Sequence, residues 1–234
     1  MTDSDLLASV FGDETHLLGE ACARWIVASR PFRAFFEANA GKIRKKARMA
    51  GDAESLRDLR LELDAAYHLL ADRRVTLVYE RYLAEKARGP DLTATFKGHV
   101  MFNVEVRRLR AAATDAKLAD TVCEKLRQMP PSSVNVLLIG LKSGGGAPVA
   151  SLDPPLDPAA SLKRLIQRAE AMHDDFFAQR GWRDAREFLR AHLRLGGVLL
   201  RFNWDEESAP RSVLWLNPQA RHPISPDIQK LLRW

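Results

Sequence analysis

The stretch of sequence that decides the fold runs from Pro90 to Arg107 and reads PDLTATFKGHVMFNVEVR. Two runs of alternating polar and apolar residues flank Lys97-Gly98-His99, and this pattern predicts a β-hairpin over residues 91–107. If the turn is centred on Gly98, Asp91 lies opposite Glu105, and directly opposed side chains have Cβ atoms about 4.5–5.5 Å apart. One face of the hairpin then carries two carboxylates nearly in contact, and the other, apolar face must pack against helices.

Two carboxylates this close repel each other and lower the stability of the fold unless a positive charge neutralises them. A divalent metal such as Mg²⁺, or Mn²⁺ in its place, suits two carboxylate ligands on neighbouring strands, and it would polarise a phosphodiester and activate a bound water. Upstream, either Glu62 or Glu80 could complete such a metal site. The alternative is that Arg107, on the same face, pairs with Glu105 and Asp91 as an ordinary ion pair. The hairpin alone leaves both interpretations open.

Patterns on both sides of the hairpin predict the rest of the core. A helix that opens at Ser55 and runs to Leu70 precedes a strand over residues 74–80. After the hairpin, a helical pattern continues to Met129, and the nearly continuous apolar run Val134–Leu141 predicts a buried central strand. The order is helix, three strands, helix, strand, which predicts an α/β (α+β) fold with a mixed central sheet.

Helices precede this core, and helices with short strands follow it. The sequence predicts helices over residues 13–28 and 31–48, a long helix from Pro158 to Phe176, a helix ending at Gly196-Gly197, strands over 198–202 and 213–216, and a short helix capped by Ser225. We therefore divide the chain into an N-terminal helical region (1–50), a core (51–145), a Gly/Pro-rich loop around Gly144-Gly145-Gly146 (146–160) and a C-terminal region (161–234).

Composition excludes several classes of protein. The chain has 234 residues, of which 46% are hydrophobic and 28% are charged, so a globular fold is expected and disorder throughout is excluded. No stretch approaches the ~18–20 apolar residues of a membrane span, and the acidic start lacks the features of a signal peptide. Cys22 and Cys123 are too few for a disulfide framework, so we expect small core residues and a reducing, cytoplasmic environment.

The net charge of +6 is concentrated in one segment. Between Arg24 and Arg48 there are eight basic residues and one acid, Glu37. Clustered positive charge on one element is typical of a polyanion-binding surface, and nucleic acid is the expected partner. The alternative is an ordinary solvated helix face. The residues that would contact the nucleic acid are Lys42, Arg44, Lys45, Lys46 and Arg48.

The hairpin and the elements around it resemble the PD-(D/E)XK nuclease superfamily, also called the restriction-endonuclease-like fold, over residues 55–141. The family motif is Pro-Asp followed, after a spacer, by an acid, any residue and lysine. Pro90-Asp91 and Glu105-Val106 match it, and Arg107 stands where the motif has lysine.

This resemblance implies that Glu62, Asp91 and Glu105 bind Mg²⁺ and that Asp91, Glu105 and the residue at position 107 are catalytic. A permanently charged arginine cannot act as a base, although it can hold a phosphate or bridge the two acids. No substitute lysine is obvious: Lys97 lies about 20 Å along an extended strand from Asp91, whereas Lys86 lies in the preceding loop and could swing in.

Two hypotheses follow for function. The first is a metal-dependent nuclease-like protein that acts on nucleic acid phosphodiesters. The second is a non-catalytic nucleic-acid-binding or assembly module that keeps the nuclease fold, in which Arg107 neutralises the acids. An Arg107 guanidinium between the two carboxylates favours the second hypothesis, and an Arg107 turned outward from an open acidic pocket favours the first. The sequence leaves the oligomeric state open, including a homodimer.

Overall fold

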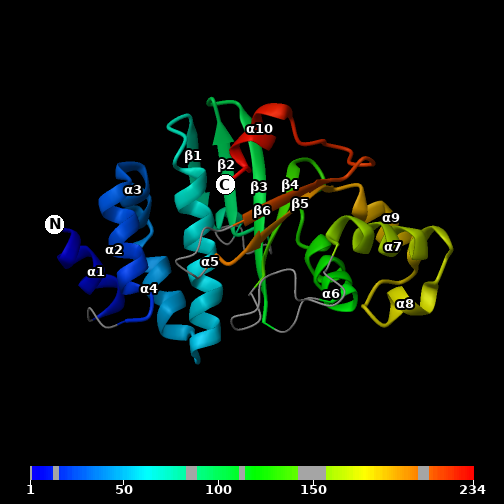
Figure 1. Ribbon diagram of the computed structural model, residues 1–234, viewed down its shortest axis with the longest axis horizontal. Coiled ribbons are helices and arrows are strands. Elements are labelled where there is room, and N and C mark those ends of the chain that lie inside the picture. Colours follow the sequence, from blue (N-terminus) through cyan, green and yellow to red (C-terminus); the bar gives the residue numbers. More distant parts are fainter. Residues whose placement is uncertain (1, 13–15, 83–88, 111–113, 142–156, 205–210) are drawn as a thin grey trace. The chain divides into compact units, whose positions relative to one another are not determined.

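The computed structural model describes residues 2–12, 16–82, 89–110, 114–141, 157–204 and 211–234. These residues form ten helices and a six-stranded sheet with strand order β1-β2-β3-β4-β5-β6 (Figure 1). The strands are β1 (Val75–Tyr79), β2 (Leu92–Phe96), β3 (Val100–Leu109), β4 (Val134–Leu141), β5 (Leu195–Phe202) and β6 (Arg211–Leu216). The helices are α1 (Asp3–Phe11), α2 (Gly19–Ala28), α3 (Arg30–Ala38), α4 (Ala40–Met49), α5 (Ala53–Leu69), α6 (Asp115–Leu126), α7 (Pro158–Glu170), α8 (Asp174–Ala178), α9 (Ala185–His192) and α10 (Pro226–Leu231).

The predicted α/β (α+β) fold class is confirmed. The expected order of helix, three strands, helix and strand is present as α5, β1, β2, β3, α6 and β4. The sheet is mixed, because β3, β4 and β5 are parallel and β6 is antiparallel to β5.

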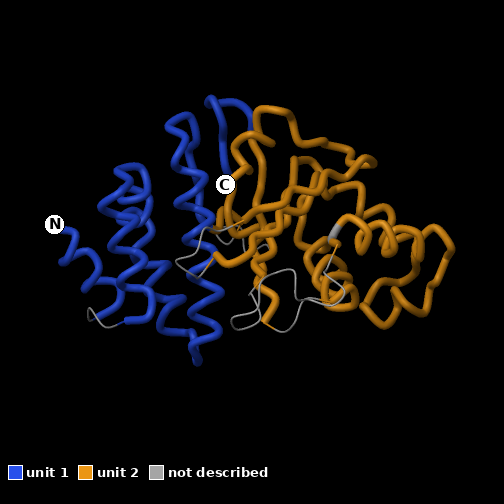
Figure 2. Tube along the Cα trace, viewed as in Figure 1, with its two compact units in different colours: residues 1–79, 94–100 blue, residues 80–93, 101–234 orange. Residues whose placement is uncertain are grey.

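The chain forms two compact units (Figure 2). Unit 1 comprises Met1–Tyr79 and Ala94–Val100, and it contains α1 to α5, β1 and the tip of the hairpin. Unit 2 comprises Glu80–Thr93 and Met101–Trp234, and it contains the parallel part of the sheet with α6 to α10. Most of the predicted Gly/Pro-rich loop, residues 146–156, lies outside the described residues, as does Gly144-Gly145-Gly146.

Local hydrogen bonds set the helix ends in unit 1. The single helix predicted over residues 31–48 is two helices, because the Asn39 side-chain amide donates to the carbonyl oxygen of Phe35 (2.7 Å) at the end of α3. Such a side-chain bond competes with continuation of the helix. Helix α5 is capped by Asp52, whose carboxylate accepts from the Ser55 amide (2.7 Å), and not by Ser55 as predicted.

The parallel strands form the centre of unit 2. Strand β4 pairs with β3 on one side and with β5 on the other, and seven of its eight residues are buried, which confirms the predicted central strand. The connections between these parallel strands contain helices, as parallel pairing requires. Residues Leu137, Ile139 and Leu141 share one core cluster with side chains of α6, α7, α8 and α9, so these helices cover that face of the sheet.

Two predicted features of the C-terminal region are wrong. The long helix predicted to reach Phe176 ends at Glu170, and Met172 then adopts a positive φ of 55° before α8 begins. The glycines at 196 and 197 do not end a helix but lie inside β5. A Cβ atom on Gly197 would lie 2.5 Å from the carbonyl oxygen of Trp215, so the close approach of β6 requires glycine at this position.

Both cysteines are core residues, as predicted. Cys22 in α2 and Cys123 in α6 are free and buried, and burial raises the pKa of each thiol to about 12.

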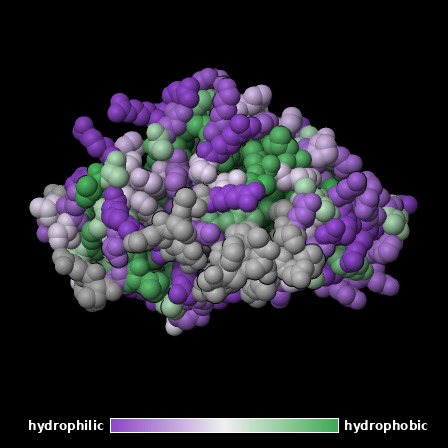
Figure 3. All heavy atoms as spheres, viewed as in Figure 1, coloured by the Kyte–Doolittle hydropathy of each residue, from purple (hydrophilic) through white to green (hydrophobic). Residues whose placement is uncertain are grey.

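On the face drawn in Figure 3, hydrophilic residues predominate over α7, α8 and α9. Among the described residues, no helix has the length and apolar character needed to cross a membrane.

Candidate functional site

Thr93, Asn103 and Glu105 on the polar face of the hairpin are buried. The hydroxyl of Thr93 donates to Oδ1 of Asn103 (2.9 Å). The Asn103 amide in turn donates to Oδ1 of Asn135 on β4 (3.0 Å). The Asn135 amide donates to the carbonyl oxygens of Pro130, Ser133 and Arg194. A chain of satisfied polar side chains therefore joins the segment at Thr93 to β3 and β4 in a buried environment, where each missing hydrogen bond would be costly.

Asp91 is held against β3 beside Glu105. It directly precedes β2, and its Oδ2 accepts from the backbone amide of Val106 (2.8 Å). Its own carbonyl oxygen accepts from the amide of Glu80 (2.8 Å). The Asp91 carboxylate thus accepts from a backbone amide of β3, as a backbone carbonyl oxygen would within the sheet. This hydrogen bond places Asp91 next to Val106, the residue that follows Glu105.

Glu105 forms an ion pair that the sequence analysis missed. Its Oε1 lies 2.6 Å from the Nζ of Lys125 on α6. Only 2% of Glu105 and 9% of Lys125 are exposed, so this is a buried pair with a charge-assisted hydrogen bond. A signal was present in the sequence: Lys125 follows Leu118 and Val122 at helical spacing, which places it on the sheet-facing side of α6.

Arg107 is turned towards the surface of α6. Its side chain is 42% exposed, and its Nη2 lies 3.8 Å from Oε2 of Glu124. Within the described residues this is the ion pair that Arg107 forms, and no ion pair joins it to Asp91 or Glu105. The positive charge beside Glu105 is therefore an amine from the following helix and not the arginine at the motif position.

In unit 1, the third predicted metal ligand is engaged by the predicted nucleic-acid-binding segment. Oε2 of Glu62 accepts from Nζ of Lys46 (2.7 Å) and from the hydroxyl of Tyr79 (2.6 Å). Lys42 donates to the carbonyl oxygen of Tyr79 (2.5 Å). Glu62 belongs to unit 1, whereas Asp91 and Glu105 belong to unit 2.

The other three residues of the basic segment differ from Lys42 and Lys46. Lys45 and Arg48 are exposed and Arg44 is half-buried, and none of the three forms an ion pair within the described part of the chain. Of the lysines considered as substitutes for the motif lysine, Lys97 stacks on the Phe96 ring (5.0 Å), and Lys86 lies outside the described residues.

The carboxylates of Asp91 and Glu105 have the donor chemistry that Mg²⁺ prefers. This ion takes one or two carboxylates and completes its coordination with water and phosphate oxygens. Over the described ranges, no group of three or more His, Cys, Asp and Glu side chains is arranged to hold a metal. A metal bound here would therefore rely on two carboxylates, one of which also binds Lys125.

Comparisons of the chain with protein-family models, curated proteins and solved structures found no match.

Proposed function

We propose that this protein is a metal-dependent, nuclease-like phosphodiester hydrolase in which Lys125 supplies the amine that the PD-(D/E)XK motif places at position 107. The observation that carries the proposal is the 2.6 Å contact between Lys125 Nζ and Glu105 Oε1, together with the outward position of Arg107. In this proposal Asp91 and Glu105 hold Mg²⁺ or Mn²⁺.

Each protein group has a distinct role in this proposal. A metal at the two carboxylates would supply Lewis acidity and a bound water of lowered pKa. Lys125 has three N–H donors, and one of them holds the Glu105 carboxylate in place. Its other donors can orient a water or a phosphate oxygen. Arg107 is at the surface and always charged, so in this proposal it would contact a backbone phosphate, and it cannot take up a proton.

The nucleic acid would be attracted by the basic segment of unit 1. Of the five basic residues from Lys42 to Arg48, Lys42 and Lys46 bond to Tyr79 and Glu62. Arg44, Lys45 and Arg48 form no ion pair or side-chain hydrogen bond within the described residues, so they are the expected phosphate contacts. We propose a cytoplasmic site of action, because both cysteines are free thiols.

The proposal is tested by a cleavage assay on single- and double-stranded DNA and RNA with Mg²⁺ and with Mn²⁺. We expect Asp91→Asn, Glu105→Gln and Lys125→Met each to lower the cleavage rate at least about 100-fold. Lys117→Met is the matched control, because it makes the same substitution at an exposed position of the same helix. Thermal unfolding of every variant shows whether the fold is retained.

Two outcomes would remove the catalytic proposal. One is absence of cleavage by the wild-type protein with either metal on all four substrates. The other is an Asp91→Asn variant that is folded and cuts as fast as wild type, since cleavage would then come from another site or from a contaminant.

A second candidate is a non-catalytic nucleic-acid-binding module. The observation that favours it is that Glu105 is neutralised inside the protein by Lys125, with side-chain exposures of 3% and 11%, so this acid needs no metal for stability. Calorimetric titration separates the candidates. Binding of Mg²⁺ or Mn²⁺ that is lost in Glu105→Gln supports the hydrolase, and nucleic-acid binding without metal binding supports the module.

A further inference from the structure

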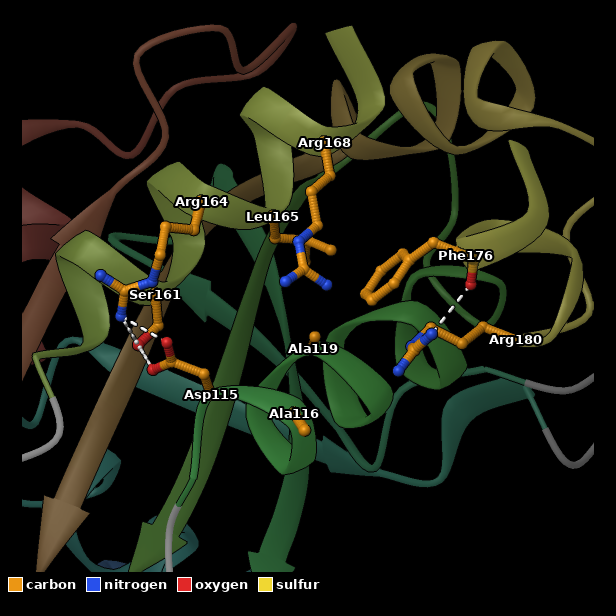
Figure 4. A pocket seen from close by; sticks show the side chains of 9 residues that line it. All are labelled: Asp115, Ala116, Ala119, Ser161, Arg164, Leu165, Arg168, Phe176 and Arg180. Atoms are coloured by element: carbon orange, nitrogen blue, oxygen red, sulfur yellow. Dashed lines mark hydrogen bonds and ion pairs between the residues drawn. The ribbon is translucent and has the colours of Figure 1, made fainter. Parts of the chain in front are cut away.

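Three arginines surround a pocket in unit 2 that the proposed active site does not use. The pocket has a volume of about 230 Å³ and lies between α6, α7 and α8 (Figure 4). Asp115 from α6 and Ser161, Arg164 and Arg168 from α7 line it. Phe176 from α8 and Arg180, just beyond that helix, complete the wall.

Two of the arginines are held in place by ion pairs with α6. Arg164 Nη2 lies 2.5 Å from Asp115 Oδ2, and Asp115 also accepts from the Ser161 hydroxyl. Arg180 Nε lies 2.8 Å from Asp120 Oδ1, and its Nη1 donates to the carbonyl oxygen of Phe176 (2.8 Å). These bonds use part of each guanidinium and fix its orientation at the pocket wall.

Arg168 is held differently. Its guanidinium stacks over the Phe176 ring at 4.6 Å from the centroid, and that of Arg180 stacks over the same ring at 3.6 Å, so the ring lies between the two groups in Figure 4. Stacking uses the flat face of a guanidinium and leaves its in-plane N–H groups available for hydrogen bonds. Arg168 forms no ion pair within the described residues.

The pocket therefore carries an excess of positive charge. Its lining residues include three arginines and one carboxylate, Asp115, which pairs with Arg164. Arg180 pairs with Asp120 outside the lining, so the charge of Arg168 is the one in excess. The pKa of that carboxyl is lowered, first by the hydrogen bond from Ser161 and then by Arg164, with a smaller contribution from the charge of Arg168. Asp115 is thus ionised at neutral pH and already paired, so the charge of Arg168 is not balanced by it.

We propose that this pocket binds the phosphate group of a phosphate monoester, with Arg168 as its principal ligand and Arg164 and Arg180 as supporting ligands. Guanidinium groups match the geometry of phosphate oxygens through paired N–H bonds. The volume is several times the roughly 30 Å³ that a water molecule occupies in the liquid, so a tetrahedral oxyanion fits. An anion between Arg164, Arg168 and Arg180 would also relieve the repulsion between neighbouring cations.

The proposed phosphate site is separate from the proposed active site. Both use α6, but Asp115 and Lys125 are ten residues apart along this helix, a distance of about 15 Å. The phosphate could belong to a small metabolite or to the 5′ end of a nucleic acid, and the two sources share the chemistry that the arginines recognise. Phosphate binding here does not depend on cleavage at Asp91 and Glu105.

Isothermal titration of the 234-residue protein at constant ionic strength tests this site. The probes are inorganic phosphate, adenosine 5′-monophosphate, and one oligonucleotide with a 5′-phosphate or a 5′-hydroxyl. We expect Arg168→Ala to weaken binding of the phosphate probes about tenfold or more, the effect of losing a charge-assisted hydrogen bond. Arg168→Lys should recover only part of the affinity, because it keeps the charge and loses the paired donors.

Lys163→Ala is the matched control, because it removes an equal charge from an exposed position of α7 outside the pocket. Its affinity should stay within about twofold of wild type, since an exposed charge contributes little. Preference for adenosine 5′-monophosphate supports a small-molecule ligand, and preference for the 5′-phosphorylated oligonucleotide supports a nucleic-acid end. The proposal is overturned if no probe binds, or if Lys163→Ala and Arg168→Ala weaken binding equally.

Discussion

At the scale of single residues, Lys125 and Glu105 have the strongest expected effect on stability. Their charges are buried together at 2.6 Å, and removal of one partner from a buried pair leaves the other charge without compensation. We expect Lys125→Met to lower the free energy of unfolding by about 3–5 kcal/mol, measured by denaturant titration. Lys117→Met, on the exposed side of the same helix, should change it by less than about 0.5 kcal/mol.

The double variant Glu105→Gln/Lys125→Met separates the charge pair from simple packing. If the two charges stabilise each other, the double variant should be more stable than the sum of the single effects indicates. Additive losses would mean that Lys125 acts through its aliphatic stem alone, and they would weaken its assignment to the proposed active site.

His192 gives the fold a dependence on pH. Its ring is buried against Phe188 and Trp215, and burial lowers its pKa from 6.5 to about 4. Between these values the unfolded chain binds a proton at His192 and the folded protein does not, so acid favours unfolding. The contribution of neutral His192 to the free energy of unfolding is about 3 kcal/mol. It is fully present above pH 6.5 and is lost as the pH falls to about 4.

Unfolding measured from pH 8 to pH 4 checks this expectation by comparing wild type with His192→Leu. The variant should lose less stability over pH 6.5 to 4 than wild type does, whatever its stability at pH 8. His99→Leu, which changes an exposed histidine in the hairpin turn, should keep the wild-type profile. Parallel profiles for wild type and His192→Leu would show that His192 does not contribute to acid sensitivity.

At the scale of elements, the close contact of β5 with β6 depends on Gly197. A Cβ atom there would meet the Trp215 carbonyl oxygen at 2.5 Å and the Ile224 side chain at 2.9 Å, and backbone cannot move aside as a side chain can. We expect Gly197→Ala to destabilise the fold by at least about 2 kcal/mol. Gly41 in α4 has nothing within 4 Å of its Cβ position, so Gly41→Ala should instead stabilise it by about 0.5–1 kcal/mol. Thermal unfolding midpoints shifted in the same direction by both substitutions would contradict this account.

Elements with a strong local pattern were predictable, and breaks set by single contacts were not. The sequence predicts the bounds of β4 correctly because Val134–Leu141 is an almost continuous apolar run. The break between α3 and α4 depends on one hydrogen bond, from the side-chain amide of Asn39 to the Phe35 carbonyl oxygen. The position of Gly196 and Gly197 inside β5 depends on packing against distant segments of the chain, such as β6 against Gly197. Propensity alone therefore assigned these glycines to a helix end.

The candidate site shows the same limit. The hairpin spacing places Asp91 close to Glu105 along the strands, because both belong to one local pattern. The partner of Glu105, Lys125, comes from α6. The helical spacing of Leu118, Val122 and Leu126 predicts an apolar buried face, and Lys125 lies on this same face. A charged residue on the buried side of a predicted helix is the signal that identifies such a partner.

At the scale of the whole molecule, the net charge of +6 is concentrated in one segment, between Arg24 and Arg48. If nucleic acid binds there, the logarithm of the binding constant falls linearly with the logarithm of the salt concentration. For duplex DNA each phosphate contact adds about −0.9 to this slope. Lys42 and Lys46 bond to Tyr79 and Glu62, so we expect the phosphate contacts to come mainly from Arg44, Lys45 and Arg48. The triple variant of these three residues to alanine should therefore reduce the steepness of the salt dependence by about 2–3.

Binding of a labelled duplex, measured by fluorescence anisotropy from 50 to 300 mM salt, gives this slope. The matched comparison is Lys42→Ala/Lys46→Ala, which removes charge from the same helix but from side chains that already bond within unit 1. It should change the slope by less than about 0.9, the effect of one contact, because each of these amines is already held by a hydrogen bond within unit 1. An equal loss per lysine or arginine in both variants would mean that α4 acts as a diffuse positive charge. An unchanged slope in the triple variant would place the nucleic-acid contacts elsewhere.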